Sequence, residues 1–331
     1  MLTSSKSPVS DGLLRVLGGL VILFFPALSN GQQLAREALS SFPADTHQVA
    51  YTNLAQLRSS PDYPQIRERL LNRQLRYFQD FLRSMAIDPD KDVDEVIFGW
   101  RGQPSDTTGL FGMAQGRFQP EQIRQYFIRS QLPSRQYAGF DLYAFGSGED
   151  PADLFFTFLD SSLAAFGRLH DLKALLDVRS RTANALETNS SFVGWEAELE
   201  DTSPQWGILS GQAAANLAAP WLAGGRKLNV DLSAFMKPVQ AVLYRVEWEN
   251  GFSSHLAIVC KNPESASALA TLLNLLRSAQ QQGTADSGAA VASILQGVEA
   301  HQNGSRLELS ASGLVAALDQ VLRGGAADPA P

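Results

Sequence analysis

The chain has 331 residues, enough for one large domain or two ordinary ones. Hydrophobic residues make up 44% and charged residues 18%, and the formal net charge of −7 lacks the basic surplus that nucleic acid attracts. The single cysteine, Cys260, excludes an intramolecular disulfide and a cysteine-cluster metal site. We therefore expect a globular protein that does not bind nucleic acid.

The N-terminal segment carries a targeting pattern. Basic residues precede an apolar run of 13 residues, 16–28, which is shorter than the roughly 20 residues that a membrane helix needs. Its length and flanks are typical of a secretory signal peptide, 1–31, with cleavage after Ser29 or Gly31. The alternative is an uncleaved anchor, the only case in which we expect contact with a membrane. The pattern thus predicts an exported protein, periplasmic or extracellular.

Residues after the signal predict a first group of elements. We expect 32–47 to form a short leader that ends in a Pro-Ala-Asp-Thr turn. Hydrophobic periodicity then predicts, in chain order, a strand at 47–54, a mainly helical segment at 55–87, strands at 93–102 and 108–118, a helix at 119–131, a hairpin at 136–145, a strand at 153–160 and a helix at 161–178.

The second half shows a similar order. Residues 179–203 form a connecting segment that contains a short capped helix. There follow a strand at 204–211, a helix at 212–223, strands at 238–251 and 252–262 around an Asn-Gly turn, a helix at 262–279 with Asn262 as its N-cap, a hairpin at 298–312 and a closing helix at 313–322.

The two halves indicate an internal repeat. The strand-to-helix corner at Pro120 and Glu121 matches that at Pro263 and Glu264. The pattern predicts an α+β fold of two tandem split-βαβ (ferredoxin-like) units, each an antiparallel sheet with helices on one face. The first unit is 32–178, the second is 204–323, and the tail 324–331 is expected to be disordered.

A glycine-containing stretch, 107–123, raises the question of phosphate binding. Gly109, Gly112 and Gly116 match neither the dinucleotide nor the P-loop spacing, and no Lys-Ser/Thr pair follows them. Strand glycines more often mark a bulge or a close approach of two backbones. We expect that structural role and assign no cofactor.

An acidic cluster suggests calcium but fails the test of spacing. It comprises Asp88, Asp90, Asp92, Asp94 and Glu95. An EF-hand loop requires Gly at its sixth position and Glu at its twelfth, and this sequence has valine and glycine there. We expect a turn in which Asp side chains accept hydrogen bonds from backbone N–H groups, and we assign no metal ligands.

Candidate nucleophiles and bases are few. Ser147 lacks the G-x-S-x-G elbow, and Cys260 lies on an alternating strand, which predicts burial. His255 and His301 lie on strands of the second unit that could be neighbours, whereas His170 is expected to be solvated or to cap its helix. No catalytic residue is assigned.

The tryptophans are expected mainly in the core or on a sheet face; they are Trp100, Trp195, Trp206, Trp221 and Trp248. The arginines of one helical segment are expected to lie on a solvated face, with a contact surface for an acidic partner or lipid headgroups as the alternative; they are Arg67, Arg69, Arg73, Arg76 and Arg83.

Three segments, 42–70, 85–100 and 155–169, carry a resemblance. With their Pro-Ala-Asp-Thr lead-in, Asp-Pro loop and Leu-Asp strand end, they are similar to uncharacterised exported bacterial proteins with tandem α+β units, a domain of unknown function. The resemblance implies an exported repeat protein and nothing more, because it carries over no catalytic residues.

These patterns favour a non-enzymatic exported protein that binds an unknown protein or envelope partner. An alternative is an exported hydrolase with a site in the cleft between the units, where His255 or His301 would meet a carboxylate and a serine within about 3.2 Å. A third is a small-molecule carrier with an apolar pocket between the units.

Overall fold

The fold was analysed in a computed structural model of the chain. The structure describes residues 30–70, 73–85, 87–102, 110–199, 203–211, 213–215, 233–248, 251–281 and 298–313. The expected signal peptide, the closing helix at 313–322 beyond its first residue, the tail, the Asn250 turn residue, Gly109 and Trp221 lie outside these residues.

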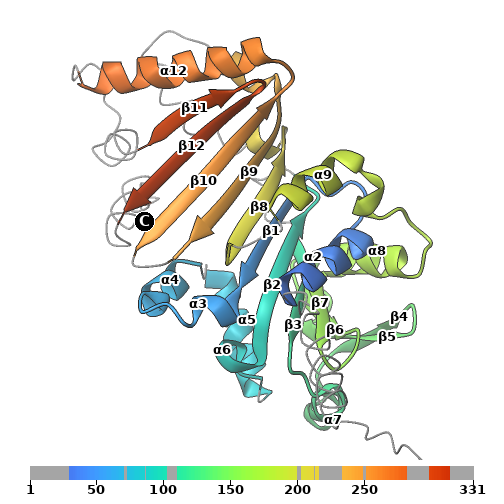
Figure 1. The fold of residues 1–331 in the computed structure, drawn as a ribbon. Coiled ribbons are helices and arrows are strands. Elements are labelled where there is room, and N and C mark those ends of the chain that lie inside the picture. Colours follow the sequence, from blue (N-terminus) through green and yellow to red (C-terminus); the bar gives the residue numbers. More distant parts are fainter. Residues whose placement is uncertain are drawn as a thin grey trace, which may run out of the picture.

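One antiparallel sheet runs through the whole described part of the chain (Figure 1). Its twelve strands, in spatial order, are β11-β12-β10-β9-β8-β1-β2-β3-β7-β6-β5-β4. In chain order they are β1 (Gln48–Asn53), β2 (Val93–Trp100), β3 (Leu110–Gly116), β4 (Ser134–Tyr137), β5 (Phe140–Phe145), β6 (Leu154–Phe158), β7 (Leu163–Arg168), β8 (Gln205–Ser210), β9 (Val239–Glu247), β10 (Phe252–Cys260), β11 (Glu299–Asn303) and β12 (Arg306–Gly313). The expected α+β class is confirmed, but as one sheet rather than two.

The two halves of the chain meet at the pairing of β1 with β8, which we call the seam. Outward from the seam, each half begins with three consecutive strands, and its last strand pairs with the third: β7 with β3, and β12 with β10. The predicted split-βαβ arrangement is not confirmed. It requires another strand between the two strands that a helix connects, whereas β1 and β2, which helices connect, pair directly and antiparallel.

Helices cover the two faces of the sheet. The helices are α2 (Asn30–Ser41), α3 (Leu54–Leu57), α4 (Tyr63–Leu70), α5 (Arg73–Ser84), α6 (Pro89–Asp92), α7 (Pro120–Ser130), α8 (Leu169–Arg179), the 3₁₀ turn η3 (Leu186–Thr188), α9 (Ser190–Leu199), α11 (Ser233–Met236) and α12 (Pro263–Gln281). We call the face packed by α2, α8 and α9 the first face, and the face packed by α5, α7 and α12 the second face. Figure 1 shows α7 and α12 toward opposite ends of the sheet.

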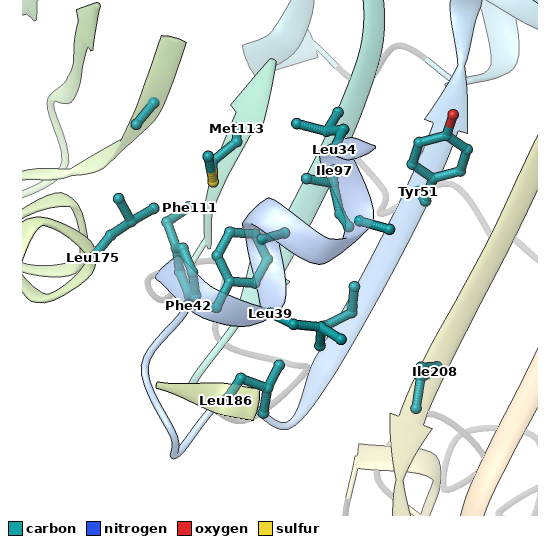
Figure 2. Close-up of a cluster of buried hydrophobic side chains, with 14 of the residues drawn as sticks. Leu34, Leu39, Phe42, Tyr51, Ile97, Phe111, Met113, Leu175, Leu186 and Ile208 are labelled. Atoms are coloured by element: carbon teal, nitrogen blue, oxygen red, sulfur yellow. The ribbon is translucent and has the colours of Figure 1, made fainter. Parts of the chain in front are cut away.

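The largest core lies on the first face, beneath α2 (Figure 2). Phe42, at the end of α2, is fully buried, and its ring meets the ring of Phe111 on β3 edge to face at 4.8 Å. Leu34 and Leu39 of the same helix are also buried, because they follow the helical period and point to the sheet. This helix therefore closes the first face over β1, β2 and β3.

Two expectations for secondary structure were wrong, the second of them only in part. The leader at 32–47 contains α2, because Leu34, Ala38 and Leu39 bury an apolar stripe on the sheet. Of the segment 161–178, expected to be helical with an interruption near Gly167 left open, the first part is a strand, β7, and the second part is helical as expected, in α8. The run of apolar residues in β7 is buried on both faces of the sheet, and short runs of this kind do not distinguish a strand from a helix.

The strand glycines have the structural role that the sequence predicts. A Cβ atom added to Gly112 would lie 2.5 Å from the carbonyl oxygen of Ile97 and 2.6 Å from the ring of Phe166. One added to Gly116 would lie 2.0 Å from the carbonyl oxygen of Asp92, next to an irregularity in the β2–β3 register. Both glycines therefore permit close backbone approach.

Candidate functional site

An apolar cavity of about 420 Å³ lies on the second face and crosses the seam. In the spatial order of the sheet, the strands β9, β8, β1, β2, β3, β7 and β6 all contribute to it. It therefore extends over six strand spacings, or roughly 29 Å of sheet. Its described lining is mainly aliphatic and aromatic: Ala50, Tyr51, Thr52, Leu54, Gln79, Leu82, Ile87, Pro89, Val93, Val96, Phe98, Ala114, Phe118, Phe156, Phe158, Ala164, Ala165, Phe166, Gln205 and Tyr244. Among these residues there is no charged side chain.

The floor of the cavity follows from strand alternation. Val96 and Phe98 are two residues apart on β2 and share the second face, while Ile97 between them enters the core of the first face. Phe98 contacts Phe166 of β7 edge to face at 5.5 Å, and Phe166 fits there because Gly112 leaves room for its ring. These half-buried aromatic rings give the cavity a rigid apolar floor.

Polar groups gather at the end of the cavity that lies beyond the seam. The indole Nε1 of Trp248 donates to Gln205 Oε1 at 2.7 Å, and Gln205 Nε2 donates to the Thr52 hydroxyl at 3.3 Å. Burial raises the pKa of Tyr244 to about 12, so its hydroxyl stays protonated at neutral pH. The described residues at this end of the cavity offer neutral hydrogen-bonding groups.

The acidic cluster lies next to the helices that line the cavity and has a structural role. Asp90 Oδ1 accepts from Arg67 Nε at 2.7 Å, and Asp90 Oδ2 accepts from Arg83 at 2.7 Å. Burial opposes ionisation of Asp90, but the two guanidinium groups outweigh it and lower its pKa. Asp88 and Asp92 accept backbone N–H groups within the same turn, as predicted. In the described residues, no group of three or more His, Cys, Asp or Glu side chains is placed to hold a metal ion.

Of the arginines expected on a solvated face, Arg83 is exposed, as expected, and Arg67 is half-buried, and both form ion pairs. Arg67 and Arg83 are both paired with Asp90, which ties α4 and α5 to α6. Their side chains are 24% and 37% exposed, and ion pairs at this exposure add little to the free energy of folding. Their role is to fix the positions of α4 and α5 relative to α6. The side chains of Arg69, Arg73 and Arg76 lie outside the described residues.

A second concavity, which we call the polar groove, lies on the first face near the other end of the sheet. It has a volume of about 460 Å³. Its charged and polar side chains come from α9 and from strands β9 to β12: Glu198, Arg245, His255, Glu299, His301, Arg306, Glu308 and Ser310. The sequence pointed to His255 and His301, and the structure places both in this groove, on strands that flank β12.

The groove does not show the contacts that the hydrolase interpretation requires. Both histidines are exposed, and neither makes a hydrogen bond with a carboxylate or serine of the described chain. Ser147 lies elsewhere, on the loop after β5, where its hydroxyl donates to Asp153 at 2.9 Å and accepts backbone N–H groups. It therefore stabilises a loop, and His170 is exposed on α8.

The remaining sequence candidates are mostly core residues. Cys260 is buried, and burial raises the pKa of its thiol, so it is a poor nucleophile. Trp206 and Trp248 are buried, as expected, whereas Trp100 and Trp195 are half-buried.

A buried carboxyl group that sequence reasoning did not single out as functional lies behind the cavity floor. Glu95 of β2 points to the first face and is 2% exposed. Neither its Oε2 atom nor the nearby Tyr51 hydroxyl has a hydrogen-bond partner of good geometry. Burial raises the pKa of Glu95 to about 7, although the Tyr51 hydroxyl partly opposes the shift. In sequence it belongs to the acidic cluster, but it lies on β2, beyond the α6 turn that contains Asp90 and Asp92.

Comparison with protein families, characterised proteins and solved structures finds no match for this chain. The resemblance to exported tandem-unit proteins therefore stays a prediction. None of the helices in the described ranges combines the length and the apolar character needed to cross a bilayer.

Proposed function

We propose that the protein binds an uncharged apolar small molecule, such as an aliphatic alcohol or an isoprenoid, in the cavity on the second face. The observation that carries the proposal is an apolar cavity of about 420 Å³ that crosses the seam and has no charged side chain in its described lining. The sequence leaves three functions open: partner binding, hydrolysis and small-molecule carriage. The apolar cavity supports the third of these. We propose no chemical step.

The size and shape of the cavity support a chain-like ligand. Ligand pockets in proteins are typically about 300–1,000 Å³, and this cavity is extended across six strand spacings. Each methylene group that leaves water contributes about 0.8 kcal/mol, so ten of them contribute about 8 kcal/mol before the cost of association. We expect dissociation constants in the micromolar range or below.

The lining also favours a neutral head group. A carboxylate at the polar end would face Gln205, Thr52 and Tyr244, and none of the described lining residues is a cation that could balance its charge. Burying an unpaired charge is unfavourable by several kcal/mol, whereas a hydroxyl can exchange hydrogen bonds with the same groups. Hexadecanol should therefore bind more tightly than palmitate at neutral pH.

The proposal is tested by displacement of the neutral fluorescent probe N-phenyl-1-naphthylamine from the purified chain. We expect hexadecanol to displace the probe at least tenfold more effectively than palmitate at pH 8. Val96→Phe and Ala164→Leu, which place extra atoms in the cavity, should each weaken probe binding at least tenfold. Ala152→Leu, an equally sized change at an exposed loop position, is the matched control and should bind as the native chain does.

Two outcomes would overturn the proposal. One is failure of the native chain to bind the probe while its thermal unfolding remains cooperative. The other is equal probe affinity in the native chain and in both filled variants, which would place the probe elsewhere.

We also propose that the protein acts outside the cytoplasm, with the apolar run 16–28 as its export signal. The support is the sequence pattern alone. Mass spectrometry of the N-terminus of the mature protein tests it: a terminus at residue 30 or 32 supports cleavage, and an intact Met1 in the membrane fraction contradicts it.

A further inference from the structure

The polar groove lies on the first face of the second half of the sheet. At the equivalent position in the first half, a helix packs on this face and buries apolar side chains. In the first half, α8 packs on the first face over β3, β7 and β6 through side chains such as Leu172, Leu175 and Phe155. The corresponding strands of the second half are β10, the third from the seam, and β12, the last in chain order, which pairs with β10; β11 lies beyond them at the edge of the sheet. There the same face carries charged and imidazole side chains.

The register places these side chains in two neighbouring rows. One row runs across β9, β10, β12 and β11 through Arg245, His255, Ser310 and Glu299. The next row contains Ala257, Glu308 and His301. Side chains directly opposite each other are about 4.5–5.5 Å apart at Cβ. The first row is therefore a continuous line of polar groups, and the second is polar at Glu308 and His301.

The groove separates positive and negative charge. Arg245 lies at the end next to β8, and Glu299 and Glu308 lie toward β11 and β12. Within the described chain none of these three side chains forms an ion pair, whereas Arg306 is held by both carboxylate oxygens of Glu198 at 2.5 and 2.6 Å. That pair forms part of the wall, and Glu308 adds a weaker electrostatic attraction to Arg306 without a direct ion pair. Arg245, Glu299 and Glu308 can therefore each form a direct contact with a ligand.

We propose that the polar groove binds a short peptide with two free termini, its carboxylate at Arg245 and His255 and its ammonium group at Glu299 and Glu308. Arg245 and Glu299 stand three strand spacings apart, about 14 Å, and both side chains reach into the groove. An extended tripeptide spans about 10 Å, which fits the distance that remains. Leu199, Leu243 and Ala257 supply an apolar surface for its side chains. This site lies on the opposite face from the apolar cavity and does not depend on it.

Isothermal titration calorimetry with Ala-Ala-Ala as the probe tests the proposal on the full chain. The native protein should bind the free tripeptide at least tenfold more tightly than its N-acetylated form and than its C-terminal amide. No binding of the free peptide, or equal binding of all three, would overturn the proposal without any variant.

Two variants assign the ends of the peptide. Arg245→Gln should remove the preference for the free peptide over the amide and keep the preference over the N-acetylated form. Glu308→Gln should do the reverse. A uniform loss of affinity for all three peptides in both variants would indicate a structural role and contradict the assignment. Glu149→Gln, in an exposed loop, is the matched control and should leave all three affinities unchanged.

Discussion

The phenol ring of Tyr51 stacks on the indole of Trp206 across the seam, with centroids 5.2 Å apart and an interplanar angle of 22°. The two residues are directly opposite each other on β1 and β8. Both are buried, at 4% exposure each. Since the seam joins the halves of the sheet, this pair is a central contact between segments far apart in the chain.

Replacing Trp206 with alanine should destabilise the protein strongly. We expect a loss of about 3–5 kcal/mol in the free energy of unfolding, because a buried ring is removed and a cavity remains at the seam. Urea denaturation followed by far-UV circular dichroism measures the loss. Trp206→Phe keeps an aromatic contact with Tyr51 and should lose clearly less; equal losses would show that stacking contributes little.

Glu95→Gln should change how stability depends on pH. The folded pKa of Glu95, about 7, lies above its ordinary value of 4.5, so the folded state holds this proton more tightly than the unfolded state. Stability therefore falls as pH rises from about 4.5 to about 7, by about 3 kcal/mol for a shift of this size, and is then constant with respect to this group. Glutamine cannot ionise and should remove that fall.

Urea unfolding at pH 5 and pH 8 measures this effect. The native chain should lose more stability between the two pH values than Glu95→Gln does, so the variant should be relatively more stable at pH 8. Glu149→Gln, where the carboxyl is exposed, should follow the native chain. If Glu95→Gln also follows the native chain, Glu95 titrates near its ordinary pKa.

Gly112→Ala and Gly194→Ala should have opposite effects. The new methyl group at Gly112 would meet the Ile97 carbonyl and the Phe166 ring, and we expect a destabilisation of about 1–3 kcal/mol. Gly194 lies within α9 with open space around its Cβ position, so alanine should stabilise the helix by about 0.5–1 kcal/mol. Thermal unfolding of both variants gives the comparison, and a stable Gly112→Ala would contradict the close approach.

Trp248→Phe should lower the stability of the protein by breaking a hydrogen bond at the polar end of the apolar cavity. It removes the side-chain N–H that donates to Gln205 Oε1 in the described part of the chain, which we expect to lower stability by about 1–3 kcal/mol because a buried oxygen loses its partner. Chemical denaturation measures the loss. Gln205→Leu combined with Trp248→Phe removes both partners, and the double variant should recover part of the loss. If the stability losses of the two single variants simply add in the double variant, the two side chains are not energetically coupled through this hydrogen bond.

The sequence predicted most of the elements but not their assembly. Alternation in β1, β2 and β10 identified these strands, and Asn262 caps α12 by accepting from the Ser265 N–H, as predicted. The direct β1–β2 pairing was not predicted because a connection through helices is equally compatible with parallel strands separated by a third. The order of elements alone does not decide between these pairings.

The two candidate sites were accessible to sequence reasoning to different degrees. His255 and His301 could be named as potential neighbours because both lie on strands of the same half. The apolar cavity could not be located, because Val96, Phe98 and Phe166 have the pattern of ordinary core residues. Whether such a face is packed or hollow depends on how α3 and α5 lie above it, which local patterns do not specify.

The seam also has a consequence for the order of folding. Its register pairs Thr52 with Gln205, so β1 must wait for β8 while much of the intervening chain forms. Loop closure over such a distance is slow compared with forming the consecutive strands of either half. During synthesis, β1 therefore presents an unpaired edge, with Ala50 and Tyr51 accessible, until β8 emerges. We expect the unpaired edge of β1 to favour intermolecular strand pairing during this interval.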